Sequence, residues 1–124
     1  MKQIYQGRLL KEVEKARDMA VIVEGKRDAE ALRELGFNNI TVLHREGISI
    51  YSVIDEIAES RPDSDVAILT DMDSKGKQYH DLLKRELAMR GIRVNDNLRK
   101  ELIKERISHV EGLATFLKNR GLAL

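Results

Sequence analysis

Two patterns of apolar residues alternate along the chain, one with the spacing of a helix and one with the continuous run of a buried strand. They predict helices and strands in alternation. Apolar positions three to four residues apart predict amphipathic helices at about residues 8–18, after Asp28, after Ser49 and at about residues 76–90. Asp28 and Ser49 are expected to cap the second and third of these helices. Gly36 is expected to stop the second helix in a left-handed conformation, and Gly91 to end the fourth.

Short apolar runs rich in β-branched residues separate the helices and predict four strands, at residues 19–23, 39–43, 65–70 and 92–94. Strands that alternate with helices predict a mainly parallel sheet, covered by helices on both faces. We therefore expect an α/β, Rossmann-like fold with a single domain over residues 1–124. It would have an N-terminal helix at about 8–18, a core at about 19–94 and a C-terminal helical segment at about 98–120.

The C-terminal segment is predicted to hold a charged helix after the turn at residues 95–97 and a last helix that Ser108 opens. Glu111 follows Ser108 at the spacing of a capping box, in which the two residues satisfy each other's backbone amides. Gly121 is expected near the end of this helix.

Composition narrows the classes of protein to consider. Charged residues make up 35% of the chain, above the usual figure of roughly 25%, but 22 Lys and Arg nearly cancel 21 Asp and Glu. The net charge of +1 therefore does not by itself indicate a nucleic-acid partner. The absence of cysteine excludes disulfides and thiol chemistry and is typical of a reducing compartment. Since no apolar run approaches the roughly 20 residues that span a bilayer, we expect a cytoplasmic protein without a membrane partner.

Acidic residues come directly after two of the predicted strands. Glu24 follows the first, and Asp71 and Asp73 follow the third. The carboxyl ends of parallel strands meet at one edge of a sheet, where ligands bind, so the three carboxylates are expected to lie close together. Their mutual repulsion would need a cation, and Mg²⁺ is expected, with Mn²⁺ as the alternative. An Asp after a strand also suits a turn, whereas Glu24 between an apolar strand and Gly25 has no such structural explanation.

Each acidic turn is followed by glycine and basic residues. Gly25 and Lys26 follow Glu24, and Lys75, Gly76 and Lys77 follow Asp73. Glycine permits a tight turn and close approach of a ligand, and the helix N-terminus that follows favours an anion. We predict that these five residues bind substrate phosphate.

The sequences VIVEGKRD at residues 21–28 and DMDSKG at residues 71–76 resemble the two motifs of the Toprim domain family. That family includes type IA and type II topoisomerases, bacterial-type primases and nucleases. The resemblance covers nearly all of the chain, and it is strongest to small stand-alone Toprim proteins and to the N-terminal domain of the bacterial 5S ribosomal RNA maturation nuclease. It implies that Glu24 acts as general acid or base and that Asp71 and Asp73 hold Mg²⁺. The stretch after Asp73 lacks a third Asp that many members carry, so one metal ion is expected.

Other candidates have structural explanations of equal or greater weight. Arg45 would lie at the same sheet edge and could contact phosphate, although a solvated loop arginine fits as well. Asp28 and Glu111 are candidates for accessory acidic roles. The basic run from Arg99 to Arg106 is explained by ion pairs along a helix at least as well as by nucleic acid. The three histidines lack the spacing of metal ligands and are not assigned to metal.

These observations favour Mg²⁺-dependent processing of nucleic-acid phosphodiester bonds, by a nuclease-like protein or a component of an RNA or DNA processing complex. Contact would be with the phosphate backbone, because aromatic residues are only 4% of the chain. The alternative is a non-catalytic, metal-dependent module that binds nucleic acid or protein. So short a chain leaves little room to hold a substrate, which makes a protein partner with that role a further expectation. Small-molecule phosphotransfer is a third class, since it also places Asp at strand ends.

Overall fold

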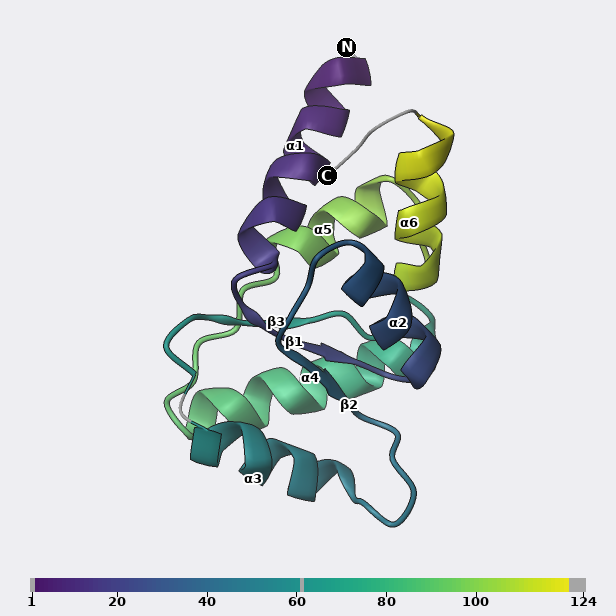
Figure 1. Ribbon diagram of the computed structural model, residues 1–124. Coiled ribbons are helices and arrows are strands. Elements are labelled where there is room, and N and C mark those ends of the chain that lie inside the picture. The colour runs from purple at the N-terminus through teal and green to yellow at the C-terminus, as the bar shows by residue number, and fades with distance from the viewer. Residues whose placement is uncertain (1, 61, 121–124) are drawn as a thin grey trace.

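The computed structural model describes residues 2–60 and 62–120, with side chains from Gly7 onward. Its centre is a parallel sheet of three strands, β1 (Ala20–Val23), β2 (Ile40–Val42) and β3 (Val66–Ile68), in the order β2-β1-β3 (Figure 1). Each strand lies inside the range expected from the sequence. The predicted α/β architecture with a parallel sheet is confirmed.

Helices cover both faces of this sheet (Figure 1). One face carries α3 (Ile50–Ser60) and α4 (Ser74–Met89), and the other carries α1 (Lys2–Ala16), α2 (Lys26–Glu34), α5 (Asn97–Lys104) and α6 (Val110–Asn119). The strand side chains alternate between the two faces, as the period of two requires. Ala20, Ile22, Val66 and Ile68 pack with α3 and α4, whereas Val21, Val23, Ala67 and Leu69 pack with the other four helices. Burial on both faces explains why β1 and β3 are continuously apolar, whereas the partly buried β2 contains Thr41.

The prediction of a fourth strand at residues 92–94 is wrong. Val94 makes only an isolated parallel bridge with Val66, flanked by hydrogen bonds from the Val66 amide to the Arg93 carbonyl (2.9 Å) and from the Asn95 amide to the Val66 carbonyl (2.8 Å). The side chain of Asn95 then accepts a hydrogen bond from the Asn97 amide (2.9 Å), which turns the chain into α5. Because the chain turns away here, the carboxyl end of β3 lacks a neighbouring strand on its outer side.

The helix ends agree with most of the predicted signals. Ser49 caps α3, its hydroxyl accepting a hydrogen bond from the Ser52 amide (3.1 Å). Gly36 and Gly91 follow α2 and α4 with φ of +91° and +77°, the left-handed region that glycine adopts readily. Asp28, however, does not cap α2. The cap is Gly25, and Asp28 lies inside the first turn, where it accepts a hydrogen bond from the Gly25 amide (3.1 Å).

The two ends of the chain differ more from the predictions. The first helix begins at Lys2 rather than at about residue 8. The last helix begins at Val110 with His109 as its cap, and the Ser108 hydroxyl is hydrogen-bonded to the His109 ring (2.9 Å). The predicted capping box of Ser108 and Glu111 therefore does not form. Gly121 lies outside the described residues.

The loop between β3 and α4 folds back onto itself at Gly76. The Thr70 hydroxyl donates a hydrogen bond to the Gly76 carbonyl (2.7 Å), and the Gly76 amide donates one to the Asp73 carboxylate (2.7 Å). A Cβ atom on Gly76 would overlap the carbonyl oxygen of Asp71. Glycine is thus required at this position by the close approach of the protein's own backbone.

Replacement of Gly76 by alanine should therefore lower the free energy of unfolding by about 1–3 kcal/mol, since backbone must move to admit the methyl group. Urea unfolding followed by far-ultraviolet circular dichroism measures this, which suits a chain without tryptophan. Gly112→Ala is the matched control. Gly112 lies within α6 and a Cβ there meets only the Ile107 side chain at 3.4 Å, so alanine should be neutral or stabilising by up to about 1 kcal/mol. Equal effects of the two changes would contradict the steric account.

Candidate acidic site

The acidic residues lie where the order of strands reverses. The chain passes from the central strand β1 to β2 on one side and then to β3 on the other. In open parallel sheets, ligands bind at such a switch point, outside the carboxyl ends of the strands. Glu24 follows β1 directly, and Asp71 follows β3, so both stand at this point.

The carboxyl group of Asp71 lies close enough to Glu24 to favour the protonated form of Glu24. Burial, the hydrogen bond with Asp71 and the negative charges of Asp71, Asp73 and Asp28 together raise the pKa of Glu24 to about 7, with burial the largest cause. Glu24 therefore exchanges its proton near neutral pH. A carboxyl group in that state is suited to general acid or base chemistry.

Asp73 is engaged elsewhere. It caps α4, where one of its carboxylate oxygens accepts the hydrogen bond from the Gly76 amide. Across residues 2–60 and 62–120, no group of three or more His, Asp or Glu side chains is placed to hold a metal ion. The structure thus brings Glu24 and Asp71 together and leaves Asp73 beside them with one oxygen used as a helix cap.

The donor chemistry of the Glu24 and Asp71 pair fits a hard divalent cation. Carboxylate oxygens are the ligands that Mg²⁺ prefers, and one or two of them suffice when water and phosphate complete its coordination. The second oxygen of Asp73 is the further acidic donor on the same loop. A cation would also relieve the repulsion that raises the pKa of Glu24.

Two further acids of the sequence analysis lie nearby with different surroundings. Asp28 is buried, with 8% of its surface exposed, and burial raises its pKa although the hydrogen bond from Gly25 lowers it. The negative charges of Asp71 and Glu111 act on Asp28 in the same direction as burial. Glu111 is exposed in the first turn of α6. Asp28 therefore stabilises the start of α2, and Glu111 adds negative charge to the same edge.

Arg99, which the sequence suggested would lie on an exposed helix surface, is buried and supports the loop that carries the site. Arg99 of α5 is only 6% exposed, and its guanidinium group donates hydrogen bonds to the carbonyls of Ile68 (3.3 Å), Thr70 (2.7 Å) and Asp71 (3.1 Å). It also reaches the Thr70 hydroxyl (3.1 Å). These donors satisfy the edge of β3 that the missing fourth strand leaves open. Burial lowers the pKa of Arg99, and the nearby carboxylates, Glu24 and Asp71 among them, oppose that effect.

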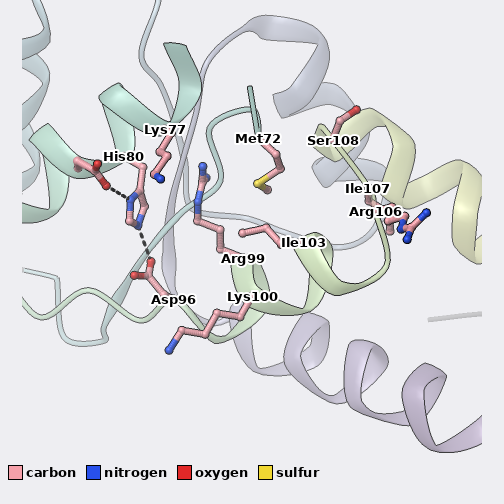
Figure 2. A pocket seen from close by; sticks show the side chains of 11 residues that line it. Met72, Lys77, His80, Asp96, Arg99, Lys100, Ile103, Arg106, Ile107 and Ser108 are labelled. Atoms are coloured by element: carbon pink, nitrogen blue, oxygen red, sulfur yellow. Dashed lines mark hydrogen bonds and ion pairs between the residues drawn. The ribbon is translucent and has the colours of Figure 1, made fainter. Parts of the chain in front are cut away.

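The basic residues predicted to bind phosphate do not form one cluster. Lys26 and Arg45 line a hollow of about 270 Å³ beside α2 and β2, where Arg45 also pairs with Glu56 (2.8 Å). The ammonium group of Lys75 lies 5.9 Å from the centre of the Tyr79 ring. Lys77 faces a different cavity, between α4 and α5 (Figure 2). Since β2 and β3 flank β1 on opposite sides, the two hollows flank the acidic pair.

Ion pairs account for much of the remaining basic surface. Lys104 lies 3.7 Å from Glu101, and Lys84 lies 2.7 Å from Asp96. His80 bridges Asp81 and Asp96 at 2.9 Å each, and the hydrogen bond with Asp96 raises the pKa of its imidazole. Within the basic run from Arg99 to Arg106, Lys104 is thus paired with an acid, as the sequence suggested, whereas Lys100 and Arg106 form no ion pair among the described residues.

The raised pKa of Glu24 predicts how stability depends on pH. The pKa of Glu24 is about 7 in the folded protein and 4.5 ordinarily, so the folded state binds this proton more tightly than the unfolded state does. The resulting stabilisation is complete below about pH 4.5 and is lost as pH rises through about 7. Glu24→Gln should consequently gain on the order of 1 kcal/mol relative to the unaltered protein between pH 5 and pH 8, after allowance for solvent screening. Urea unfolding at both pH values in EDTA measures this. Glu30→Gln, at an exposed position of α2, should show no such gain, and a pH-independent difference for Glu24→Gln would contradict the assignment.

The burial of the Arg99 guanidinium group leads to a second prediction. Arg99→Met should lower the free energy of unfolding by about 2–4 kcal/mol, because it removes the guanidinium donor from the buried carbonyls of Ile68 and Thr70. Arg99→Lys should recover only part of the loss, since an ammonium group cannot reproduce the planar fork. Lys100→Met, one residue along and exposed, should cost less than about 0.5 kcal/mol. An Arg99→Met protein as stable as Lys100→Met would show that these hydrogen bonds contribute little.

Comparison with known proteins identifies relatives of this chain in three organisms. The chain is 32% identical over 108 residues to a UPF0292 protein of Methanocaldococcus jannaschii, covering 85% of this chain and 83% of that one. It is 39% identical over 75 residues to a UPF0292 protein of Thermoplasma volcanium, covering 60% of this chain and 61% of that one. A solved structure of a protein from Aquifex aeolicus is 30% identical, with a TM-score of 0.72 and coverage of 86% and 95% of the two chains.

No helix among the described residues is long and apolar enough to span a membrane.

The Toprim domain model matches residues 19–111, a range that contains both acidic turns and Arg99. Toprim domains are typically metal-binding domains of nucleic-acid processing enzymes, and Mg²⁺ is the usual ion. The chain belongs to the Toprim domain family and is similar to small proteins of the UPF0292 group.

Proposed function

We propose that this protein processes phosphodiester bonds of RNA or DNA in a Mg²⁺-dependent reaction, with nuclease-like chemistry at the acidic edge of its sheet. The observation that carries the proposal is the pairing of Glu24 with Asp71 at the switch point between β1 and β3. Two neighbouring carboxyl groups at a ligand-binding edge cost stability unless they serve a cation or a proton transfer.

The roles proposed for the acids are those that the family resemblance implies, and their surroundings support them. Asp71 and Asp73 would hold a single Mg²⁺, which when bound neutralises charge on the phosphate oxygens. Glu24 moves the proton, because it alone among the three acids directly follows the central strand and faces Asp71 from the opposite side of the switch point. Asp28 binds its own backbone and takes no part in the chemistry.

Basic residues on both sides of the pair suit a phosphate backbone. Lys26, Arg33 and Arg45 line the hollow beside β2, and Lys77 and Lys100 line the cavity beyond β3. A strand that crosses the acidic edge would meet cations before and after the reacting phosphate. Contacts of this kind position nucleic acid without reading its sequence.

A second function, metal-dependent binding without turnover, is favoured by one specific observation. Asp73 already caps α4 through one oxygen, so the site offers fewer free acidic oxygens than three unoccupied carboxylates would. A module of this kind would grip a phosphate backbone or a protein partner, and a partner would supply the remaining catalytic or substrate-holding groups.

Cleavage assays with a matched pair of variants distinguish these functions. The substrates are structured RNA, single-stranded DNA and double-stranded DNA, each with Mg²⁺, Mn²⁺ or EDTA. Structured RNA belongs in the panel because the motifs resemble those of the 5S ribosomal RNA maturation nuclease. We expect metal-dependent cleavage that Glu24→Gln reduces at least about 100-fold and that Glu59→Gln, at an exposed position of α3, leaves unchanged. Binding by Glu24→Gln, measured by electrophoretic mobility shift, should persist because the variant removes a negative charge.

Three other outcomes of these assays would indicate a different function or a different role for Glu24. Salt-dependent binding with no cleavage of any substrate selects the binding module. Equal cleavage by the unaltered protein and Glu24→Gln rejects Glu24 as the proton carrier. Turnover confined to acyl phosphates or phosphomonoesters, assayed in parallel, places the activity in small-molecule phosphotransfer.

A further inference from the structure

A cavity of about 460 Å³ includes Met72 of the acidic loop in its wall (Figure 2). Neither Glu24 nor Asp71 lines it. Its walls come from the first turns of α4, from α5 and from the connection between α5 and α6. The volume falls in the range of small-molecule sites, about 300–1,000 Å³. Neither the proposed metal site nor the proton transfer at Glu24 accounts for it.

One part of the wall is apolar. Met72, Ile103 and Ile107 line the cavity, and Ile103 is 54% exposed although it lies on a helix that otherwise turns its apolar residues inward. Exposed aliphatic side chains grouped around a hollow mark a binding surface more often than isolated ones do. The wall offers an apolar face for a flat organic group.

The rest of the wall carries positive charge that the protein does not neutralise. Lys77, Lys100 and Arg106 line the cavity, and within residues 2–60 and 62–120 none of the three forms an ion pair. The two acids of the wall are engaged with other cations. Asp96 binds His80 and Lys84, and Asp81 binds His80. The unpaired cations therefore favour an anionic ligand.

The cavity is physically joined to the acidic loop. Met72 stands between Asp71 and Asp73 in the sequence, and its amide donates a hydrogen bond to the carbonyl of Ser108 (2.8 Å), another residue of the cavity wall. Its side chain both packs against the core and lines the cavity. A ligand here would lie directly beside the metal-holding loop.

We propose that this cavity binds one nucleotide unit, with its base against Met72, Ile103 and Ile107 and its phosphate on the side of Lys77 and Lys100, opposite Arg106 (Figure 2). The combination of an apolar wall and unpaired cations matches a ligand with a flat, weakly polar body and an anionic group. The choice of ligand class rests on the proposed function, since a nucleotide unit beside the acidic edge would hold the end of a strand whose neighbouring phosphate is the reacting one. A free nucleotide has the same chemistry and is the other source.

Calorimetric titration in EDTA tests the cavity without requiring catalysis. The probes are adenosine monophosphate, adenosine, inorganic phosphate and a 5′-phosphorylated trinucleotide. We expect adenosine monophosphate or the trinucleotide to bind, and adenosine and phosphate to bind at least about tenfold more weakly, because each offers only half of the contacts. Binding of adenosine monophosphate identifies a free-nucleotide site, and binding of the trinucleotide alone identifies a strand-end site.

Two matched pairs of variants locate the binding. Lys100→Glu and Ile103→Glu should each weaken it at least about tenfold. Their controls, Lys104→Glu on the same helix and Met89→Glu at a 75% exposed position of α4, should change it less than about twofold. The proposal is overturned if no phosphorylated probe binds, or if each control weakens binding as much as its partner. Because EDTA removes metal from these titrations, that result would leave the cleavage assays of the acidic pair unaffected, and a failure of those assays would leave this one standing.

Discussion

The acidic edge of this protein depends on the buried guanidinium group of Arg99. The sheet ends at β3, and a strand edge buried against protein needs donors for its carbonyl groups. Arg99 supplies donors to three carbonyl groups, those of Ile68 at the end of β3, Thr70 and Asp71. The same contacts place a positive charge below the carboxylates, so one side chain closes the sheet and lowers the electrostatic cost of holding acids above it.

The four acids around this edge divide into two kinds. Asp28 and Asp73 each bind a backbone amide at the start of a helix, α2 and α4, and thereby fix the two turns that carry the site. Glu24 and Asp71 have no such backbone partner among the hydrogen bonds of the described residues and face each other instead. The fold therefore uses Asp28 to build the site and leaves the side chains of Glu24 and Asp71 free of backbone contacts, whereas Asp73 combines its role as a helix cap with its proposed role as a metal ligand. The family resemblance alone does not separate Asp71 from Asp73 in this way.

Periodicity located the three strands, most helix ends and the edge at which Glu24 and Asp71 lie, because buried strands and amphipathic helices leave direct marks in a sequence. The prediction of a fourth strand failed because the chain turns at Asn95, directly after the single bridge of Val94 with Val66. The capping role of Asp73 had a readable signal, the spacing of Asp73 to the amide of Gly76 at the start of a helix. Arg99 had none of comparable strength. A buried arginine in a charged helix looks like its exposed neighbours until the position of β3 is known.

The loop from Thr70 to Gly76 is closed on itself by the Thr70 hydroxyl, the Asp73 carboxylate and the tight contact of Gly76 with Asp71. Holding a residue in one backbone conformation costs about 1–2 kcal/mol of conformational entropy. Here that ordering is completed when the chain folds, and it does not recur when a ligand arrives. The loop is preorganised, so binding energy at this edge is available for orienting a phosphate rather than for ordering the protein.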